Sequence, residues 1–374
     1  MKKVLRYFSI YGFGRTLIKV AGRTRLSFLR FYFIKLLFKK ESSISLIGCG
    51  QFGFSTISYF LMRKQGNRFL ECYDPNKLNQ SSAAKFWGYK EQADVTKLIA
   101  NNKCKILYIA SNHASHTPYA IAGLKAGKKI FIEKPVSVSY KQFSELLKAK
   151  TETSGDLYVG YNRPFSKAIS ILKKFPKGQG RLPISLSCFV TGHFIDKNHW
   201  YRDKEEGTRI CGNLGHWIDL SIHLLNDAGQ IPEAFDISIS YSNMTEIDDN
   251  ISVSITTELN DLIVLVLTSR SEPFEGINET INFQSGTLIA KIDDFRSMQI
   301  WDREKYFSYS FSPKDVGHQK AINQPFNNWD RDFNEIEVST VLMLEITEMV
   351  QRNQKNRQII VSDILNDLKN VIAN

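Results

Sequence analysis

Apolar and polar positions divide the chain into two patterns. From residue 44 to about 160, apolar runs of strand length alternate with stretches of helical period, and these runs lie at 44–48, 68–73, 105–110, 128–132 and 156–160. Such alternation predicts a parallel sheet with helices on both faces. From residue 182, strand-like runs follow one another with turn residues between them, at 183–191, 234–241, 251–259, 261–270, 279–283, 286–293 and 298–302. This second pattern predicts a large, mainly antiparallel sheet with one covered face.

A glycine-rich turn follows the first apolar run. Gly48, Gly50 and Gly53 form a Gly-x-Gly-x-x-Gly between a strand and a helical pattern, with Gln51 and Phe52 inside it. In a dinucleotide site the first glycine allows the tight turn, the second admits the pyrophosphate, and the third lets helix and strand pack closely. The pyrophosphate then lies at the helix N-terminus.

Two charged residues end later strands of the same half. Asp74 stands 21 residues after Gly53, where a carboxylate can hold the ribose hydroxyls of NAD, although in Asp-Pro-Asn it can also be a turn residue. Lys134 lies in the triplet Glu133-Lys134-Pro135 at the end of a strand, and ligands of open α/β sheets bind beyond such ends. The alternative for Lys134 is a surface lysine before a turn proline.

A helical pattern at 215–225 carries a second polar group. His216, Asp219 and His223 share one face of this helix at spacings of three and seven. Without another His or Cys cluster nearby they make a poor zinc site, so no metal is expected. His216 is either a general base near the start of its helix or a histidine satisfied in the core.

These patterns predict three parts. We expect an N-terminal extension at 1–42, a dinucleotide-binding Rossmann domain with a doubly wound parallel sheet at 43–163, and an α+β substrate and dimerisation domain at 164–374 that ends in closing helices. The five dispersed cysteines include no Cys-x-x-Cys pair, which favours neither disulfides nor a zinc knuckle and fits a reducing cytoplasm.

The net charge of +11 changes this picture only at the N-terminus. The first 40 residues contain eleven Lys and Arg and no Asp or Glu, which leaves 38 basic and 38 acidic residues in the remainder. An electroneutral body gives no reason to expect a nucleic-acid partner.

Within residues 1–40 a helical projection separates basic from apolar side chains. The basic side holds Arg15, Lys19, Arg23 and Arg30, and the opposite side holds Leu17, Ala21, Phe28 and Tyr32. Uncharged runs are far shorter than the ~20 residues that span a bilayer. Three interpretations stay open: a segment lying on anionic membrane, a helix that packs on the body or a partner with its charges toward water, or an organelle transit peptide.

Several motifs together resemble the Gfo/Idh/MocA oxidoreductases. They are the glycine motif, the run 109–116, the run 122–135 that ends in Glu-Lys-Pro, and the run 160–164, and the resemblance extends from about residue 43 to 225. The segment 199–223 is similar to the branch found in surface-polysaccharide biosynthesis, in which His216 matches the active-site histidine. Many relatives carry an acid three or four residues before that histidine, whereas this chain has Gly212 and Asn213.

The resemblance implies an NAD-dependent oxidoreductase, with NADP also possible, that moves hydride between nicotinamide and a sugar or nucleotide sugar. Lys134 would polarise the reacting oxygen and His216 would move its proton. The implied cofactor contacts are Gly48, Gly50, Gln51, Phe52, Gly53, Asp74, Ser111, Asn112, His116 and Glu133. The implied substrate contacts are Asn162, Arg163, Trp200, Tyr201 and Asn213.

The resemblance also implies a homo-oligomer. The cysteines favour a cytoplasmic location, and the basic segment 1–40 adds the expectation of peripheral contact at the inner face of the membrane. Two alternatives stay open: an NAD-dependent glycosidase of the same architecture, and a cofactor-binding assembly protein that has lost catalysis.

Overall fold

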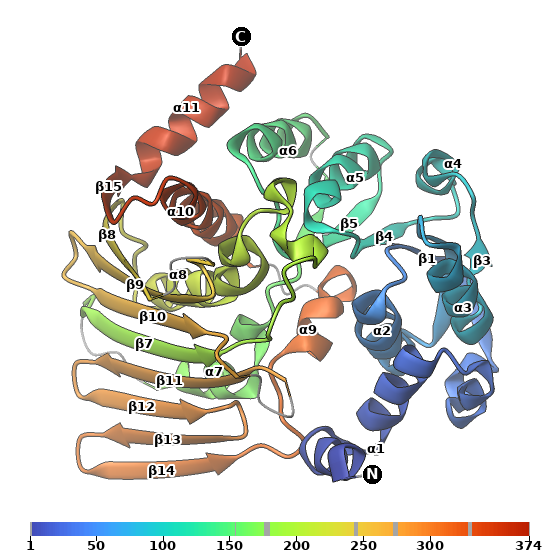
Figure 1. The fold of residues 1–374 in the computed structure, drawn as a ribbon, viewed down its shortest axis with the longest axis horizontal. Coiled ribbons are helices and arrows are strands. Elements are labelled where there is room, and N and C mark those ends of the chain that lie inside the picture. The colour runs from blue at the N-terminus through green and yellow to red at the C-terminus, as the bar shows by residue number, and fades with distance from the viewer. Residues whose placement is uncertain are drawn as a thin grey trace.

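Two sheets stand side by side in the computed structural model, which describes residues 2–153, 155–175, 180–242, 246–271, 276–327 and 331–373 (Figure 1). The first sheet has six parallel strands in the order β3-β2-β1-β4-β5-β6. Its strands are β1 (Lys39–Ile47), β2 (Asn67–Tyr73), β3 (Lys90–Glu91), β4 (Ile106–Ile109), β5 (Lys129–Ile132) and β6 (Leu157–Val159). This is the doubly wound order predicted from the alternating pattern.

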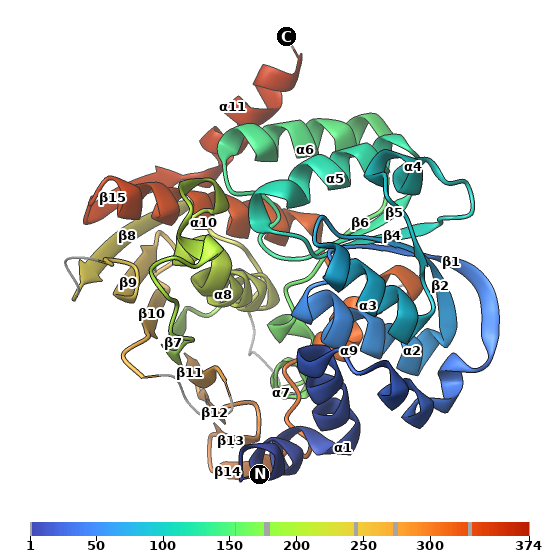
Figure 2. The same ribbon diagram turned by 45° about the vertical axis from the view of Figure 1, so that its right-hand side comes forward.

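Helices cover both faces of this sheet. They are α2 (Ser58–Gln65), α3 (Lys77–Trp87), α4 (Val95–Ala100), α5 (His113–Lys125) and α6 (Tyr140–Thr153). Figure 2 shows α5 and α6 above the sheet and α2 and α3 below it. Because both faces are covered, the central strand β4 is apolar and all four of its residues are buried.

The second sheet has nine strands in the order β14-β13-β12-β11-β7-β10-β9-β8-β15. They are β7 (Ile184–Thr191), β8 (Ala234–Tyr241), β9 (Asn250–Thr257), β10 (Leu262–Thr268), β11 (Asn278–Ser285), β12 (Leu288–Asp293), β13 (Ser297–Asp302), β14 (Lys305–Ser310) and β15 (Asn356–Ile360). Burial alternates along β7, because one face packs on helices α8 (Gly215–Asp227) and α10 (Phe333–Gln351). The β7–β10 pair is parallel, and the other described pairs are antiparallel, so the predicted fold class is confirmed.

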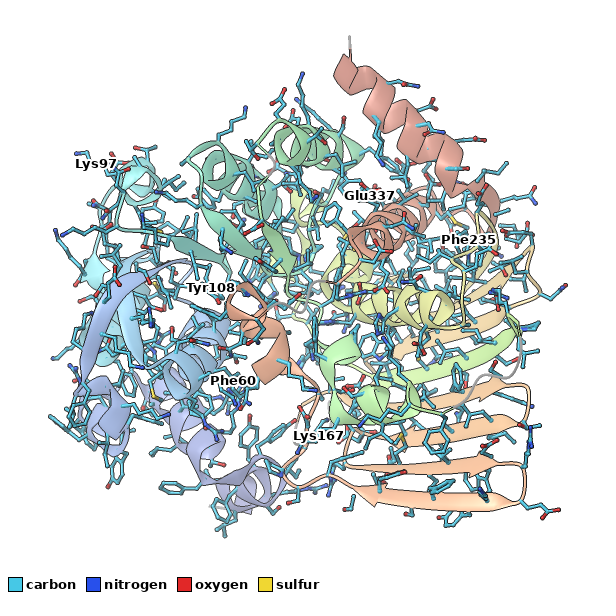
Figure 3. All side chains as sticks on the ribbon, turned by 180° about the vertical axis from the view of Figure 1, so that it is seen from behind. Phe60, Lys97, Tyr108, Lys167, Phe235 and Glu337 are labelled. Carbon is cyan, nitrogen blue, oxygen red and sulfur yellow. The ribbon has the colours of Figure 1, made fainter. Side chains whose placement is uncertain are left out.

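Short helices join the two halves. They are α7 (Lys167–Leu172), α9 (His318–Ile322) and the closing helix α11 (Val361–Ala373). Although α9 follows the second sheet in sequence, it packs on the first domain, where the Tyr108 hydroxyl donates to the Ile322 carbonyl at 2.7 Å. Figure 3 shows Tyr108 and Phe60 beside this helix. A helix from the C-terminal half of the chain therefore packs against β4, a central strand of the first sheet.

The N-terminal segment packs on the body. Helix α1 (Lys2–Thr24) bends at Gly12, and two short 3₁₀ turns, η1 (Ser27–Tyr32) and η2 (Ile34–Leu36), lead into β1. Its apolar residues buried there are Ile10, Ile18, Ala21, Phe33 and Leu36. The carbonyl of Ile10 also accepts a hydrogen bond from the backbone of Lys314, beyond β14. The segment thus contacts both domains, and β1 begins at Lys39 rather than at residue 44 as predicted.

The segment packs on the body, but its basic side chains do not all point toward water as that interpretation expected. Arg15, expected to face water, lies over the rings of Tyr59 and Phe60 and donates to the Ser55 carbonyl at 2.6 Å. Burial lowers the pKa of Lys19 to about 8. Phe28 and Tyr32, which only the packing interpretation placed against the body, are exposed. Within the described residues, no helix has the length and apolarity to span a bilayer.

Replacing Ile18 by alanine tests this packing. Ile18 is fully buried against the dinucleotide-binding domain, so its truncation should lower the free energy of unfolding by about 2–5 kcal/mol. Leu5→Ala is the control, because Leu5 lies on the same helix and is exposed, and it should change stability by less than about 0.5 kcal/mol. Denaturant titration measures both, and equal effects of the two substitutions would contradict the packing.

Candidate functional site

The glycine turn after β1 is shaped to admit a phosphate. Gly48 has a φ of +92°, and a Cβ there would overlap the Ala110 carbonyl. A Cβ on Gly53 would overlap the Gly48 carbonyl, so helix and strand are in direct contact. A Cβ on Gly50 would have no atom within 4 Å. The turn is therefore closed on the protein side and open at its middle glycine, which fits a dinucleotide pyrophosphate.

Asp74 binds the same turn from the end of β2. One carboxylate oxygen accepts from the Cys49 backbone N–H at 2.7 Å, and the other accepts from the Asn76 N–H at 2.8 Å. The second bond is that of an Asx turn, as the turn interpretation of Asp74 expects, while its binding of ribose hydroxyls stays a prediction. Each carboxylate oxygen can accept more than one hydrogen bond, so capacity for ribose hydroxyls is left.

Arg25 of the N-terminal segment reaches this corner as well. Its guanidinium donates to the Cys49 carbonyl at 3.2 Å, to Ser82 Oγ at 3.1 Å and to Asn79 Oδ1 at 3.1 Å. Burial lowers the pKa of Arg25, and the neighbouring Cys49 and Asp74 oppose that shift. No sequence signal places a residue so far before the glycine motif beside Asp74, because only the folding back of the segment brings it there.

Lys134 joins the two domains. It follows β5, and its Nζ donates to the Gly212 carbonyl at 2.6 Å. The Tyr201 hydroxyl donates to the same oxygen at 3.2 Å. A Cβ on Gly212 would overlap the Tyr201 ring, and it would lie 3.0 Å from the His113 ring. A side chain at position 212, one of the two places where an acid was expected, would need the space that Tyr201 and His113 fill.

His216 lies in the first turn of α8, one turn after the carbonyl that binds Lys134. Burial lowers the pKa of His216 well below its usual value, and the charges of Arg163 and Lys134 add to the shift. Its Nδ1 is buried with no hydrogen-bond partner among the described residues, so no carboxylate relay acts on that nitrogen. The imidazole is therefore neutral near pH 7 and able to accept a proton.

Glu206 is a site residue that the sequence patterns missed. Its carboxylate accepts from the Asn112 side chain and, at 3.0 Å, from the Ala114 backbone N–H at the start of α5. It is buried at the end of a 3₁₀ turn (Lys204–Glu206), and the resemblance of segment 199–223 did not single it out, although an acid at a helix N-terminus is a favourable pairing. Its bond to Asn112 fixes the side chain expected to flank the nicotinamide.

His116 holds the Lys134 turn to β4. Its Nδ1 lies 2.9 Å from the Pro135 carbonyl, and its Nε2 lies 3.1 Å from the Ser111 carbonyl. Burial lowers the pKa of His116 to about 4, so the neutral ring donates to one of the two carbonyls at a time. Burial also raises the pKa of Glu133 to about 8, so this carboxyl is largely protonated near neutral pH.

The expected substrate residues occupy two different environments. Trp200 and Tyr201 pack edge-on against the His113 ring, with centroids 5.0 and 4.7 Å away, and thus lie over the start of α5. Arg163 is buried in a two-point ion pair with Glu279, at 2.9 and 3.1 Å.

Two amides expected beside the sugar bind protein groups instead. The Asn162 amide donates to the Val316 carbonyl at 2.5 Å, and Asn213 accepts from Arg209 at 3.3 Å. These contacts, like the Arg163 ion pair, favour structural roles.

The His216, Asp219 and His223 face does not form a metal centre. Asp219 pairs with Arg331 at 2.8 Å, and His223 lies 2.9 Å from a carboxylate oxygen of Glu335. In the part of the chain that the structure describes, no three His, Cys, Asp or Glu residues are grouped to hold a metal ion.

The parallel sheet, the glycine turn and the lysine at the end of β5 define a dinucleotide-binding Rossmann domain joined to an α+β domain. Residues 43–161 match the Gfo/Idh/MocA family, described as "Oxidoreductase family, NAD-binding Rossmann fold". The predicted resemblance and the NAD-type cofactor are thereby confirmed for this domain.

Two curated proteins are similar in sequence to part of this chain. An inositol 2-dehydrogenase from Klebsiella pneumoniae (strain 342) is 26% identical over 188 residues, which are 49% of this chain and 54% of that protein. A 2,7-anhydro-N-acetylneuraminate hydratase from Escherichia coli (strain K12) is 24% identical over 193 residues, 50% of each chain. The chain thus matches about half the length of these curated relatives.

Among solved structures, UDP-N-acetylglucosamine 3-dehydrogenase from Acidithiobacillus ferrooxidans superposes with a TM-score of 0.68 at 17% identity, covering 83% of this chain and 97% of that one. At this identity the similarity establishes the fold.

Cofactor binding tests the Asp74 corner. We expect NADH to bind more tightly than NADPH, because Asp74 accepts from ribose hydroxyls and repels a 2′-phosphate. Arg25→Gln should weaken NADPH binding about tenfold and leave NADH binding nearly unchanged, since only the phosphate gains a charged hydrogen bond from Arg25. Arg23→Gln, an exposed change in the last turn of α1 two residues before Arg25, is the control. Fluorescence titration measures both cofactors, and tighter NADPH binding by the native protein would refute the role of Asp74.

Unfolding should become easier as the pH falls from 7.5 to 5.5. Burial lowers the pKa of five histidines in the folded chain: His113, His116, His216, His223 and His318. Below pH ~6.5 the unfolded chain protonates these rings and the folded chain does not, so acid favours unfolding. Glu133 and Asp219, whose pKa values rise to about 8 and about 6, oppose this effect but are fewer.

Each net proton contributes about 1.4 kcal/mol per pH unit to this slope. Thermal melts across the range measure it, and His116→Gln should make the slope shallower. A melting temperature that is constant or rises toward pH 5.5 would contradict the neutral state of these rings.

Proposed function

We propose that this protein is an NAD(P)-dependent oxidoreductase that acts on a sugar or nucleotide sugar. The observation that carries the proposal is the bond from Lys134 to the Gly212 carbonyl, which joins the end of β5 to the helix of His216. A cation and a neutral imidazole thereby share one junction, on the sheet edge where the glycine turn opens. The sugar class rests on the inositol and UDP-N-acetylglucosamine dehydrogenases among similar proteins.

The nicotinamide, when bound, supplies or accepts the hydride. Lys134 donates one of its three N–H bonds to Gly212, which leaves two for the reacting oxygen of the substrate. In the direction of oxidation, His216 accepts the hydroxyl proton. Its Nδ1 is buried, so Nε2 is the nitrogen available to the substrate. Lys134 then stabilises the negative charge that develops on the oxygen.

Aromatic side chains suit the substrate side of this junction. Tyr201 is held to Gly212 beside Lys134, and Trp200 is partly exposed next to it. Aromatic rings present apolar faces that match the C–H surface of a sugar. We place the sugar against these two rings and assign Asn162, Arg163 and Asn213 to the support of the loops around it.

A different overall reaction is possible with the same machinery. The similar hydratase from Escherichia coli has a name that denotes loss or gain of water, which transfers no net electrons. A glycosidase that oxidises and re-reduces its cofactor within one turnover would likewise leave the amount of NADH unchanged. Net absorbance change at the reduced nicotinamide band separates these reactions from a dehydrogenase. Bound cofactor without any turnover would favour an assembly protein.

The cellular setting belongs to the same proposal. A cytoplasmic homo-oligomer that works in polysaccharide or nucleotide-sugar metabolism agrees with a sugar substrate. The large sheet offers a surface for subunit contact, because its strands alternate between buried and exposed residues and one face points away from α8 and α10. Light scattering in solution would measure the number of subunits.

Substituting Lys134 by methionine tests the chemistry. The change keeps the chain length but removes the charge and the donors, so kcat should fall by about 10²–10³. The substrate is first found by screening nucleotide sugars and free inositols for net NADH formation. Cofactor affinity should stay near that of the native protein, because Lys134 faces the reacting oxygen rather than the adenosine.

Lys125→Met is the matched control, since Lys125 is an exposed lysine of the same domain and should keep native turnover. A Lys134→Met variant with nearly native kcat would refute the assignment. Equal loss in both variants would point to damage unrelated to the site.

A further inference from the structure

An exposed apolar surface covers the outside of residues 26–38. Large apolar side chains that are exposed number nineteen in the described residues, and eleven of them lie in the first 38 positions of the chain. In residues 26–38 they are Leu26, Phe28, Phe31, Tyr32, Ile34, Leu37 and Phe38, which we call the N-terminal apolar patch. Such clustering is unusual for a free surface and marks an interaction site.

The local backbone explains why these side chains point outward together. A 3₁₀ turn repeats every three residues, so side chains at i and i+3 lie in one row. Phe28, Phe31, Ile34 and Leu37 follow this spacing and are 57, 67, 66 and 59% exposed. Phe33 and Leu36 lie between them in sequence and are buried against the dinucleotide-binding domain. One side of the segment anchors it, and the other side presents a row of apolar groups.

The surroundings of the patch are basic. The segment contacts α2 and α3, where Arg30 donates to the Lys85 carbonyl and Lys35 donates to the Arg63 carbonyl, at 2.8 and 2.7 Å. These helices contribute Arg63, Lys64, Lys77 and Lys85 and contain no acidic residue. Residues 1–40 contain no acidic residue, and the basic residues Arg23, Lys35, Lys39 and Lys40 are exposed there.

We propose that the N-terminal apolar patch docks on an anionic lipid surface. Apolar side chains would enter the boundary between headgroups and acyl chains while the surrounding Lys and Arg bind anionic headgroups. A second copy of the chain fits the surface less well, because a symmetric contact would set basic rims against each other. The docking is independent of the proposed reaction, and it would place the dinucleotide-binding domain against the membrane.

Flotation of the full-length protein with vesicles tests the docking. We expect binding to vesicles of phosphatidylcholine with a quarter phosphatidylserine, little binding to phosphatidylcholine alone, and loss of binding as salt shortens the Debye length. Phe28→Ser with Phe31→Ser should weaken binding at least about tenfold, since both rings leave water when bound. Phe194→Ser with Ile289→Ser is the matched control, because these exposed residues lie outside the segment, and it should bind as the native chain does.

Charge variants test the second half of the proposal. Replacing Lys40, Lys64 and Lys85 together by glutamine should weaken binding to acidic vesicles on the order of 100-fold, because each basic group near the surface contributes about fivefold. The substituted side chains are exposed, so thermal melts should show that the variants fold.

A dye of environment-sensitive fluorescence on a Phe31→Cys variant gives a second measurement. Its emission should shift to the blue with acidic vesicles, while the five native cysteines are buried and stay unlabelled. Binding that ignores lipid charge, or that survives Phe28→Ser with Phe31→Ser, would overturn the proposal. A dimeric native protein that becomes monomeric in this double variant would also overturn the proposal, because a second copy would then cover the patch.

Discussion

The bond between the Lys134 ammonium and the Gly212 carbonyl holds the candidate site together. It joins a strand end of one domain to the π-helical turn (Ile210–Leu214) that runs into the His216 helix of the other, at 2.6 Å. The bond depends on close approach, because Tyr201 and His113 lie where a side chain on residue 212 would be. A glycine at this position is therefore a condition for the junction.

Desolvation sets the charges of this junction. Burial keeps His216 and His116 neutral and raises the pKa of Glu133 to about 8, so the carboxyl beside Lys134 is mostly protonated near pH 7. The Lys134 ammonium is then not neutralised by the adjacent Glu133 carboxyl. It is therefore suited to stabilise an oxygen that gains negative charge. The same burial lowers the free energy of unfolding in acid, because the buried histidines take up protons only when the chain unfolds.

The N-terminal segment has two different sides. One side packs on the body, and we propose that the other side binds the membrane. Arg15 and Arg25 turn inward and bind backbone carbonyls of the Gly-rich turn and its helix, while phenylalanines face water. Burial of these arginines is favourable here because carbonyl oxygens accept their hydrogen bonds and aromatic rings make cation–π contacts with them. The segment therefore couples a lipid-facing surface directly to the corner that holds Asp74.

The sequence alone determined the two sheets and the elements that carry the chemistry. Periodicity and turn glycines are local properties, so β8 was predicted at 234–241, where the structure has it, and the lysine after β5 was predicted at a strand end. Only the tertiary structure decided which side chains contact one another in the site. Arg25 and Glu206 enter the site although no motif singled them out, and Arg163 is paired with a residue 116 positions away.

The direction in which α1 faces was also beyond the sequence. Helical projection separates basic from apolar side chains, but it does not say which side meets the body. Arg15 faces the body because a carbonyl oxygen and an aromatic ring there bind its guanidinium. These groups come together only in the folded chain. Local pattern thus determines elements, whereas contacts between distant segments determine orientation and the composition of the site.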